Sequence, residues 1–264
     1  MLVAPVARVI ASVVVFTLAS NCATNMMQTV EVRKLAVADG SSCPPELLDN
    51  PPSSPQGNER SLADRLKGMN RRELLQVFAN GRAPTAEEMG EWFSCQSEGN
   101  EYCEWDAMLL DNNSIVMNAS SKFFTYQLFG GTLLPWRLLG EASRAKGRWN
   151  GKAFAKPTTL TTGKGINRFS GRESNFRRHE FDYDVVRSAV LQNEDSLALR
   201  LDYWRYQSLP ISPWWSMHDE VRVINSPNSS KKDDESIVLI GMGWMGWSGG
   251  ALNCSPFILE RSSN

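Results

Sequence analysis

Apolar and polar residues alternate with a period of two along much of the C-terminal part of the chain. Between residues 180 and 185, Phe181, Tyr183 and Val185 alternate with three acidic residues. Segments 197–203 and 215–223 also place apolar residues at alternate positions. Because successive side chains of a strand point to opposite faces, each segment predicts a strand with one buried and one solvated face.

From residue 105 onward, seven runs of this type follow one another, separated by turn-forming residues and without long helices between them. The runs are RWNGKAF, GINRF, FRRHEFDYDVV, SLALRLDYW, WSMHDEVRVI, SIVLIGMGW and PFILE. This order predicts an antiparallel meander that closes into a barrel or folds as a sandwich. We therefore expect a mainly β protein in which residues 105–264 form a small antiparallel barrel.

A period close to that of a helix precedes the strands. Ser61 can cap a helix that ends near Gly81, because apolar residues recur there at roughly helical spacing. These residues are Leu62, Leu66, Leu74, Leu75 and Phe78. Thr85 and Glu88 match a capping box and predict a short second helix. We interpret residues 61–104 as a brace of one or two short helices that lies on the β core.

The first residues have the layout of a targeting segment. Arg8 is followed by an apolar run from Val9 to Leu18 and then by small residues, which is typical of a secretory signal peptide. The run is short for a membrane span, so we expect residues 1–22 to be removed and the mature chain to have no stable membrane span. A signal anchor and a buried helix are the alternatives. Residues 23–60, which include the proline-rich stretch 43–60, predict a linker.

Cysteine usage and sequons fit the same route. Cleavage would leave four cysteines, an even number that suits an oxidising compartment. A disulfide between Cys95 and Cys103 and another between Cys43 and Cys254 are possible, with free thiols as the alternative. Four N-x-S sequons occur, at Asn112, Asn118, Asn228 and Asn253. The expected location is the secretory pathway or the extracellular space, and a plastid reached through a bipartite signal is the alternative.

Composition restricts the possible functions. The 28 Lys and Arg residues nearly balance 29 Asp and Glu residues, which disfavours nucleic-acid binding through phosphate neutralisation. The chain has only two histidines, so mechanisms that need several imidazoles are excluded. Nine Trp and eleven Phe require extensive burial or a ligand that covers them.

Two glycine motifs match known functional signatures, but the sequence around them does not fit the corresponding sites. Residues 241–246 match G-x-G-x-x-G, but too few residues follow Gly246 for the βαβ unit of a dinucleotide site, so we interpret these glycines as strand residues packed against aromatic side chains. Residues 246–250 match G-x-S-x-G, although no acid and histidine follow Ser248 in the order of that hydrolase fold. A triad of Ser248, His218 and an acid on another topology stays as an alternative.

Metal and cofactor sites are not expected from the sequence. His179 and His218 could bind a metal ion with Asp182, Asp184 or Asp219, but such residues are more often surface charges or buried polar groups with partners. We therefore expect no metal and no cofactor.

The segment Gly147-Arg148-Trp149-Asn150-Gly151 stands where the β region begins. With it, the chain resembles the GXWXG-type proteins of unknown function and, more loosely, the lipocalin-like (calycin) β-barrels. The resemblance covers roughly residues 147–243 and implies that Trp149 closes one barrel end against an arginine from a late strand. Arg222 is the candidate for that arginine, so these two residues have an expected structural role.

The alternation also predicts which residues face the interior. A mostly apolar lining with a few polar groups is typical of a small-molecule pocket. We expect a small hydrophobic ligand such as a fatty acid, isoprenoid or pigment, bound by Tyr183, Tyr203, His179, Asp219 and Trp244. The alternatives are an isomerase, cyclase or lyase for an apolar substrate, and a structural subunit of a larger complex. In the enzyme, His179 or Asp219 would be the general base, and Tyr203 or Arg168 would stabilise the oxyanion. The sequence does not define the oligomeric state.

Overall fold

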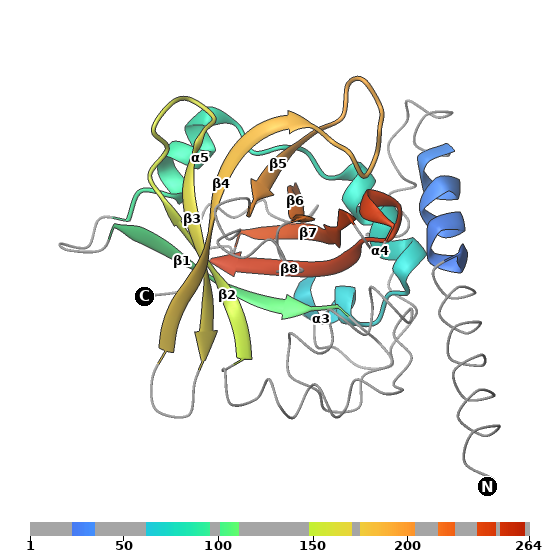
Figure 1. The fold of residues 1–264 in the computed structure, drawn as a ribbon, viewed down its shortest axis with the longest axis horizontal. Coiled ribbons are helices and arrows are strands. Elements are labelled where there is room, and N and C mark those ends of the chain that lie inside the picture. The colour runs from blue at the N-terminus through green and yellow to red at the C-terminus, as the bar shows by residue number, and fades with distance from the viewer. Residues whose placement is uncertain are drawn as a thin grey trace, which may run out of the picture.

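The computed structural model describes residues 23–34, 62–95, 101–110, 148–170, 175–203, 216–224, 237–246 and 249–261. Eight antiparallel strands form a closed barrel in which each strand pairs with its sequence neighbours and β8 pairs with β1 (Figure 1). The predicted fold class, a mainly β antiparallel barrel preceded by short helices, is therefore confirmed. Within the described residues, no helix is both long enough and apolar enough to cross a bilayer.

Seven of the strands match the seven predicted runs, and the first one was missed. The strands are β1 (Tyr102–Leu109), β2 (Arg148–Ala155), β3 (Gly163–Ser170), β4 (Asn175–Arg187), β5 (Leu197–Asp202), β6 (Met217–Ile224), β7 (Val238–Met245) and β8 (Ser255–Arg261). The missed strand β1 begins three residues before Trp105 and closes the barrel by pairing with both β2 and β8. The G-x-G-x-x-G motif lies largely in β7, which pairs antiparallel with β6 and β8 and supports no dinucleotide site.

The described part of the helical brace contains three helices where the spacing predicted one or two. They are α3 (Leu62–Lys67), α4 (Arg71–Asn80) and α5 (Ala86–Trp92). The break before α4 arises because Asn70 acts as an N-cap, in a capping box with Glu73. The predicted capping box of Thr85 and Glu88 begins α5. A further helix, 23–34, lies in the segment for which composition predicts a linker.

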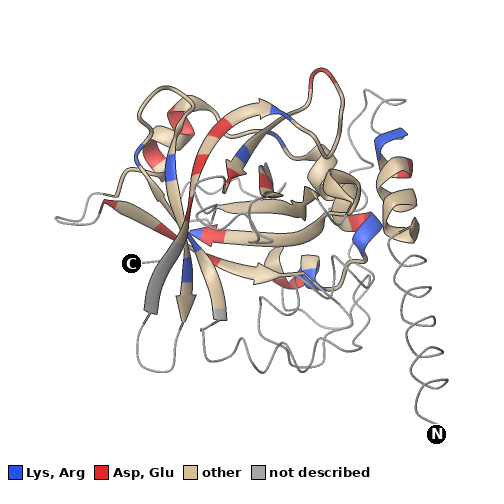
Figure 2. Cartoon of the chain, viewed as in Figure 1, with Lys and Arg blue, Asp and Glu red and all other residues tan. Residues whose placement is uncertain are grey.

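One sector of the barrel wall is covered by helices on its outer face. Every residue of β7 is buried, and nearly every residue of β6. Outward-facing side chains of β6, β7 and β8 join α3, α4 and helix 23–34 in one apolar cluster. Figure 2 shows the contrast with β4, where acidic residues alternate with uncharged residues along the strand. The sequence of β7 accordingly lacks the polar alternation of β4, because both of its faces are packed.

Helix 23–34 is held against this sector by two buried arginines. Arg71 of α4 donates to the Asn25 carbonyl at 2.6 Å, to Thr29 Oγ1 at 3.0 Å and to the Cys254 carbonyl at 3.1 Å. Arg33 donates to the carbonyl groups of Ala189 and Val190 beyond β4. Figure 1 shows the helix beside α4. These contacts tie helix 23–34 to the backbone just before β8, at Cys254, and to the backbone after β4, at Ala189 and Val190.

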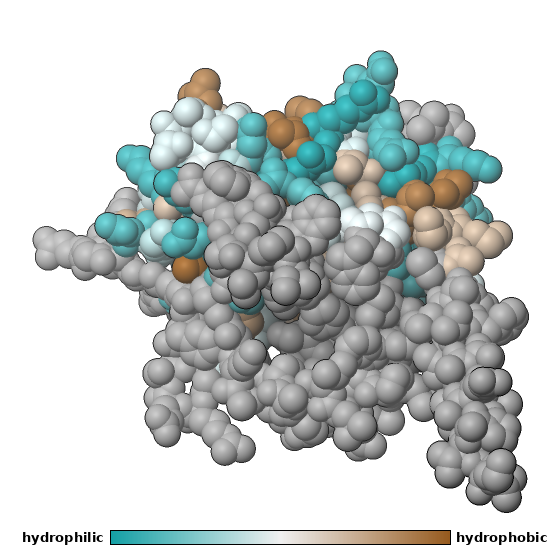
Figure 3. Space-filling view, in the orientation of Figure 1, coloured by the Kyte–Doolittle hydropathy of each residue, from teal (hydrophilic) through white to brown (hydrophobic). Residues whose placement is uncertain are grey.

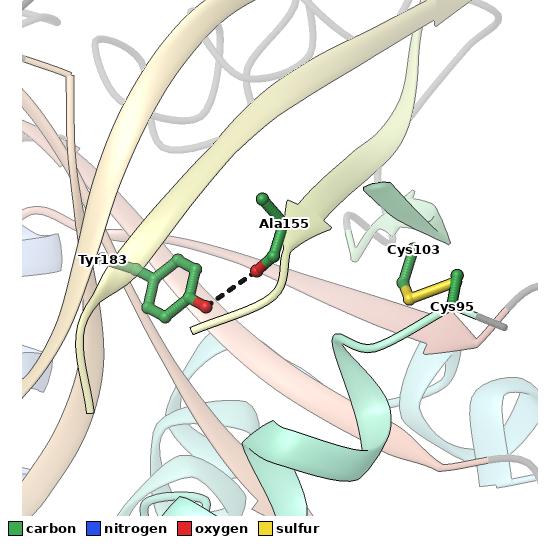
Figure 4. Close-up of a disulfide and its surroundings, with 4 residues drawn as sticks. All are labelled: Cys95, Cys103, Ala155 and Tyr183. Atoms are coloured by element: carbon green, nitrogen blue, oxygen red, sulfur yellow. Dashed lines mark hydrogen bonds between the residues drawn. A yellow bond between two sulfur atoms is a disulfide. The ribbon is translucent and has the colours of Figure 1, made fainter. Parts of the chain in front are cut away.

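The end of the barrel near α5 is filled by aromatic rings. Phe93, at the end of α5, stacks on Phe154 of β2 with ring centroids 4.4 Å apart, and it meets Trp105 and Tyr183 edge-on. Glycines in neighbouring strands make room for such rings, since a Cβ on Gly163 would lie 2.2 Å from the Tyr183 hydroxyl. A disulfide between Cys95 and Cys103 links the segment after α5 to β1, as the sequence suggested (Figure 4).

The structure contradicts two expectations about covalent modification, one about a disulfide and one about a glycosylation sequon. Cys254 is a buried free thiol that contacts Arg71, so the suggested pairing with Cys43 is wrong. Asn253 is fully buried and accepts a hydrogen bond from Asn25, which leaves no room for a glycan on this sequon in the folded chain. The predicted signal segment (residues 1–22), Cys43, Ser248 and the other three sequons lie outside the described residues.

Candidate functional site

A lysine lies inside the barrel, at a position that simple alternation would place outside. The pairing of β2 with β3 skips Asn150, because Trp149 pairs with Phe169 and Gly151 pairs with Arg168. Such a bulge inserts one residue and reverses the faces that follow it. Lys152 therefore shares the interior face with Trp149, and only 1 % of its surface is exposed.

Three polar groups from different strands contact the Lys152 ammonium group. Lys152 Nζ lies 2.7 Å from Asp219 Oδ2 of β6 and 2.9 Å from Asn167 Oδ1 of β3, and it also hydrogen-bonds the Tyr203 hydroxyl. The Tyr203 hydroxyl, just after β5, donates to Asp219 Oδ2 at 2.6 Å. Trp149 Nε1 donates to Asn167 Oδ1 at 3.1 Å. These five residues form one interior network, which we call the Lys152 network.

Aromatic rings surround the lysine beyond its polar contacts. The ring centroids of Trp149, Phe181, Tyr203 and Phe257 lie 5.1–5.5 Å from Lys152 Nζ. A cation at this distance from aromatic faces gains electrostatic stabilisation, more so where water is excluded. The Phe257 ring covers Gly241 of the neighbouring strand, where a Cβ would lie 2.1 Å from it. This close packing agrees with the interpretation of the motif glycines as strand residues beside aromatic rings.

Burial shifts the proton equilibria of two members of the network. It lowers the pKa of Lys152, because the ammonium ion loses its hydration, and the Asp219 carboxylate offsets part of this effect. Burial also raises the pKa of Tyr203 well above its ordinary value, and the adjacent Asp219 carboxylate raises it further. Tyr203 therefore keeps its proton and acts as a hydrogen-bond donor to Asp219.

Asp219 retains an unused acceptor. Its Oδ2 atom receives both Lys152 and Tyr203, whereas its Oδ1 atom is buried and has no hydrogen-bond partner among the described residues. Gly243 of β7 lies directly opposite Asp219 in register. Because directly opposed residues share a face of the sheet, the wall beside this carboxylate carries no side chain. Asp219 Oδ1 could therefore accept a hydrogen bond from one further N–H or O–H group.

The structure brings two of the predicted site residues together and separates the others. Tyr203 and Asp219 meet in the Lys152 network. Tyr183 is also interior but lies at the α5 end, where its hydroxyl donates to the Ala155 carbonyl at 2.8 Å (Figure 4). It also lines a surface depression of about 250 Å³ between the β2–β3 loop and β4.

The expected contact between Trp149 and Arg222 is wrong. Trp149 packs edge-on against Phe257, inside the barrel. Arg222 points outward and donates to the carbonyl groups of Phe78 and Ala79, at 3.0 and 2.9 Å. It thereby caps the last turn of α4, where carbonyl groups lack helical partners, and burial lowers its pKa to about 10. The cation beside Trp149 is Lys152.

Trp244 and Arg168 do not line the interior either. Trp244 belongs to the apolar cluster under the helices and stacks on His218, which pairs with Asp202 at 2.6 Å on the outer wall. Arg168 binds Glu104 and Asp106 of β1 at 2.7 and 2.8 Å, outside the barrel. Both positions agree with the alternation once it is known which face of each strand points into the barrel.

His179 occupies a second bulge. The pairing of β3 with β4 skips it, since Ile166 pairs with Glu180 and Asn167 pairs with Arg178. Its φ of 65° lies in the left-handed region, which is uncommon for a residue with a side chain. The ring packs edge-on against Phe169, with centroids 5.2 Å apart. Asp219, the other predicted candidate for the general base, hydrogen-bonds Lys152 and Tyr203.

Lys152 and Asn167 are interior polar residues that were not among the residues predicted for the site. The signal for Lys152 was the pair Asn150-Gly151 inside a strand, because glycine within a strand often marks a bulge. For Asn167 the signal was the alternation of Gly163, Gly165, Asn167 and Phe169, which places an amide in an inward row. Among the described residues, no group of histidine, cysteine or acidic side chains is arranged to hold a metal ion.

The fold and the network define the chain as a closed antiparallel barrel with a charged group inside an aromatic interior. No protein-family model, curated protein or solved structure matches the chain. The chemistry of the Lys152 network therefore carries the functional argument.

Proposed function

We propose that the barrel binds a small, largely apolar molecule that carries one polar head group. The binding site is the half of the interior away from α5, and the head group meets Asp219. The unpartnered Asp219 Oδ1 atom is the observation that carries this proposal. Lipocalin-like barrels, which the sequence resembles, provide the general architecture for such binding.

A buried acceptor without a partner is energetically unfavourable, because it has lost its hydrogen bonds to water. Leaving such a group unsatisfied costs about 1–3 kcal/mol, and more when it is charged. Buried polar atoms therefore almost always have a protein or solvent partner. A ligand hydroxyl or N–H group beside Gly243 would satisfy Asp219 Oδ1, while aromatic rings cover the apolar body of the ligand.

The charges of Lys152 and Asp219 favour some of the ligand classes that the sequence suggested over others. Lys152 already pairs with Asp219, so the network has no unpaired positive charge for a second carboxylate. A fatty acid would bring a negative charge next to Asp219 in a region of low dielectric, which is unfavourable. An isoprenoid or pigment with a hydroxyl or carbonyl head group avoids that repulsion. The aromatic filling at the α5 end further favours a short molecule.

The structural-subunit hypothesis gains no comparable support from the described residues. Their large exposed apolar side chains are Met27, Val30, Leu160 and Leu197. These lie on helix 23–34, in the β2–β3 loop and at the start of β5, and do not form one surface. In Figure 3 the hydrophobic colour likewise appears in separate small areas of the visible face. Scattered apolar side chains are normal on monomeric proteins.

Titration calorimetry with citronellol, a short isoprenoid alcohol, tests the proposal. We expect saturable binding to the wild type, weaker binding of decanoate, and a loss of affinity for citronellol in Asp219→Asn. Asp202→Asn, which changes a half-buried carboxylate on the outer wall, is the matched control and should bind as the wild type does. Binding that is absent for every short isoprenoid alcohol, or unchanged in Asp219→Asn, would contradict the proposal.

A further inference from the structure

We propose that Lys152 forms a covalent imine with a ligand that carries an aldehyde or ketone group. This inference rests on the proposed function, because it uses the same interior site, and it adds carbonyl compounds, whose oxygen can accept from Tyr203, to the ligands of that site. It gives Lys152 the role of a nucleophile, although the strand alternation in the sequence predicts no chemical role for this residue.

The geometry of Lys152 carries the inference. A lysine becomes nucleophilic when it is removed from water, because burial favours the neutral amine. Lys152 is enclosed by four aromatic rings and has an acid group 2.7 Å from its nitrogen. The surface lysines Lys156 and Lys164 are exposed to solvent and lack such an enclosure.

The groups that face Lys152 can move the protons that imine formation requires. Asp219 from β6 and Tyr203 after β5 are the titratable groups that contact its nitrogen among the described residues, and Asn167 from β3 is a neutral acceptor. Asp219 can take a proton from the ammonium ion and return it to the ligand. Tyr203 stays protonated, so it can donate to the carbonyl oxygen that becomes negative during attack.

The reaction balances without an oxidant or a reductant. The ammonium proton passes to Asp219, and the nitrogen lone pair forms a bond to the carbonyl carbon. The carbonyl oxygen takes the proton from Asp219, and the nitrogen returns one of its own protons to the carboxylate. Asp219 then protonates the hydroxyl group, the carbon–oxygen bond breaks, and one water molecule leaves. The product is a protonated imine at Lys152 with the Asp219 carboxylate as its counter-ion.

Reductive trapping tests this chemistry directly. The wild type is incubated with citronellal, the aldehyde that corresponds to citronellol, and with sodium cyanoborohydride, which reduces imines to stable amines. Peptide mapping by mass spectrometry then locates the adduct. We expect Lys152 to be modified first, at a lower pH than Lys156 and Lys164, because burial lowers its pKa. Modification of the surface lysines with none at Lys152 would overturn the inference.

Variants separate this inference from the proposed function. Lys152→Arg keeps a cation beside Asp219 but cannot form an imine, so the interior adduct should be lost, whereas Lys156→Arg and Lys164→Arg should retain it. Mapping of the wild type gives an answer even if Lys152→Arg fails to fold. If citronellol binds reversibly and citronellal gives no adduct at Lys152, the imine is refuted and the binding function stands. If neither compound binds, both ideas fail.

Discussion

The two halves of the barrel interior differ in the charge that they enclose. Near α5 the interior consists of aromatic rings, one pair stacked and the others edge-on, and the Tyr183 hydroxyl donates to the neutral Ala155 carbonyl. In the other half Lys152 and Asp219 form a buried ion pair with an unused carboxylate oxygen. A stable barrel needs the first arrangement, because dense apolar packing provides most of the folding free energy.

The second half is a poor choice if stability alone is considered. Replacing a buried ion pair by well-packed apolar residues is often neutral or stabilising, since two charges must lose their hydration. The Lys152 network is therefore better explained by chemistry than by stability. The α5 half therefore provides apolar packing that holds the barrel together, and the proposed function belongs to the Lys152 half.

The largest effect should come from breaking the buried ion pair. Asp219→Leu leaves the Lys152 ammonium group uncompensated in an apolar interior, and we expect a loss of about 3–5 kcal/mol in the free energy of unfolding. Adding Lys152→Met should recover much of that loss, because the unpaired charge is removed. Urea denaturation of the two single variants and the double variant measures the coupling. Additive losses would show that the two residues do not act as a pair.

Replacing one glycine by alanine in each half of the interior distinguishes effects on packing from effects on ligand binding. A Cβ on Gly163 would lie 2.2 Å from the Tyr183 hydroxyl, and one on Gly241 would lie 2.1 Å from the Phe257 ring. Forcing such rings aside costs about 1–3 kcal/mol, so Gly163→Ala and Gly241→Ala should both lower the melting temperature. We expect only Gly241→Ala to weaken citronellol binding, because Phe257 surrounds Lys152. Equal binding by both variants would weaken the assignment of the site.

The two interior tyrosines give a finer comparison. Tyr203→Phe removes a hydrogen bond to a carboxylate and should cost about 1.5–3 kcal/mol, whereas Tyr183→Phe removes one to a neutral carbonyl and should cost about 0.5–1.5 kcal/mol. Thermal denaturation measures both losses. A larger loss in Tyr183→Phe would show that Asp219 is satisfied without Tyr203.

The smallest effect concerns the anchoring of α5. Arg82 and Thr85 hydrogen-bond Glu88 and lower the pKa of its carboxyl group. The folded protein therefore binds fewer protons at this group than the unfolded chain, and its contribution is fully present above the ordinary pKa of glutamate. That contribution disappears as the pH falls through the lowered pKa.

Glu88→Gln isolates this contribution. We expect a loss of about 1 kcal/mol or less at pH 7, since the pair is partly exposed, and a smaller difference from the wild type at acidic pH. Urea denaturation of both proteins across this range is the measurement. A difference that grows on acidification would show that the sign is wrong.

Much of the barrel could be predicted from the sequence because strand periodicity is local. The rows Phe181, Tyr183 and Leu199, Leu201 needed only alternation, and the burial of these residues agrees with it. The capping box at Thr85 and Glu88 is equally local, since its partners are three residues apart. The contact between Tyr203 and Asp219 could be predicted in part, because alternation places both residues on the inward faces of adjacent strands.

The site required the tertiary structure because bulges and wall coverage are not local. One extra residue at Asn150 turned Lys152 inward, and the helices over β7 decided that Trp244 is buried outside the interior. The sequence by itself determined which segments become strands, since side-chain alternation is a property of each segment. Only the closed barrel decided which side of a strand is the interior, and it brought a lysine, a carboxylate and a phenol from different strands within hydrogen-bonding distance.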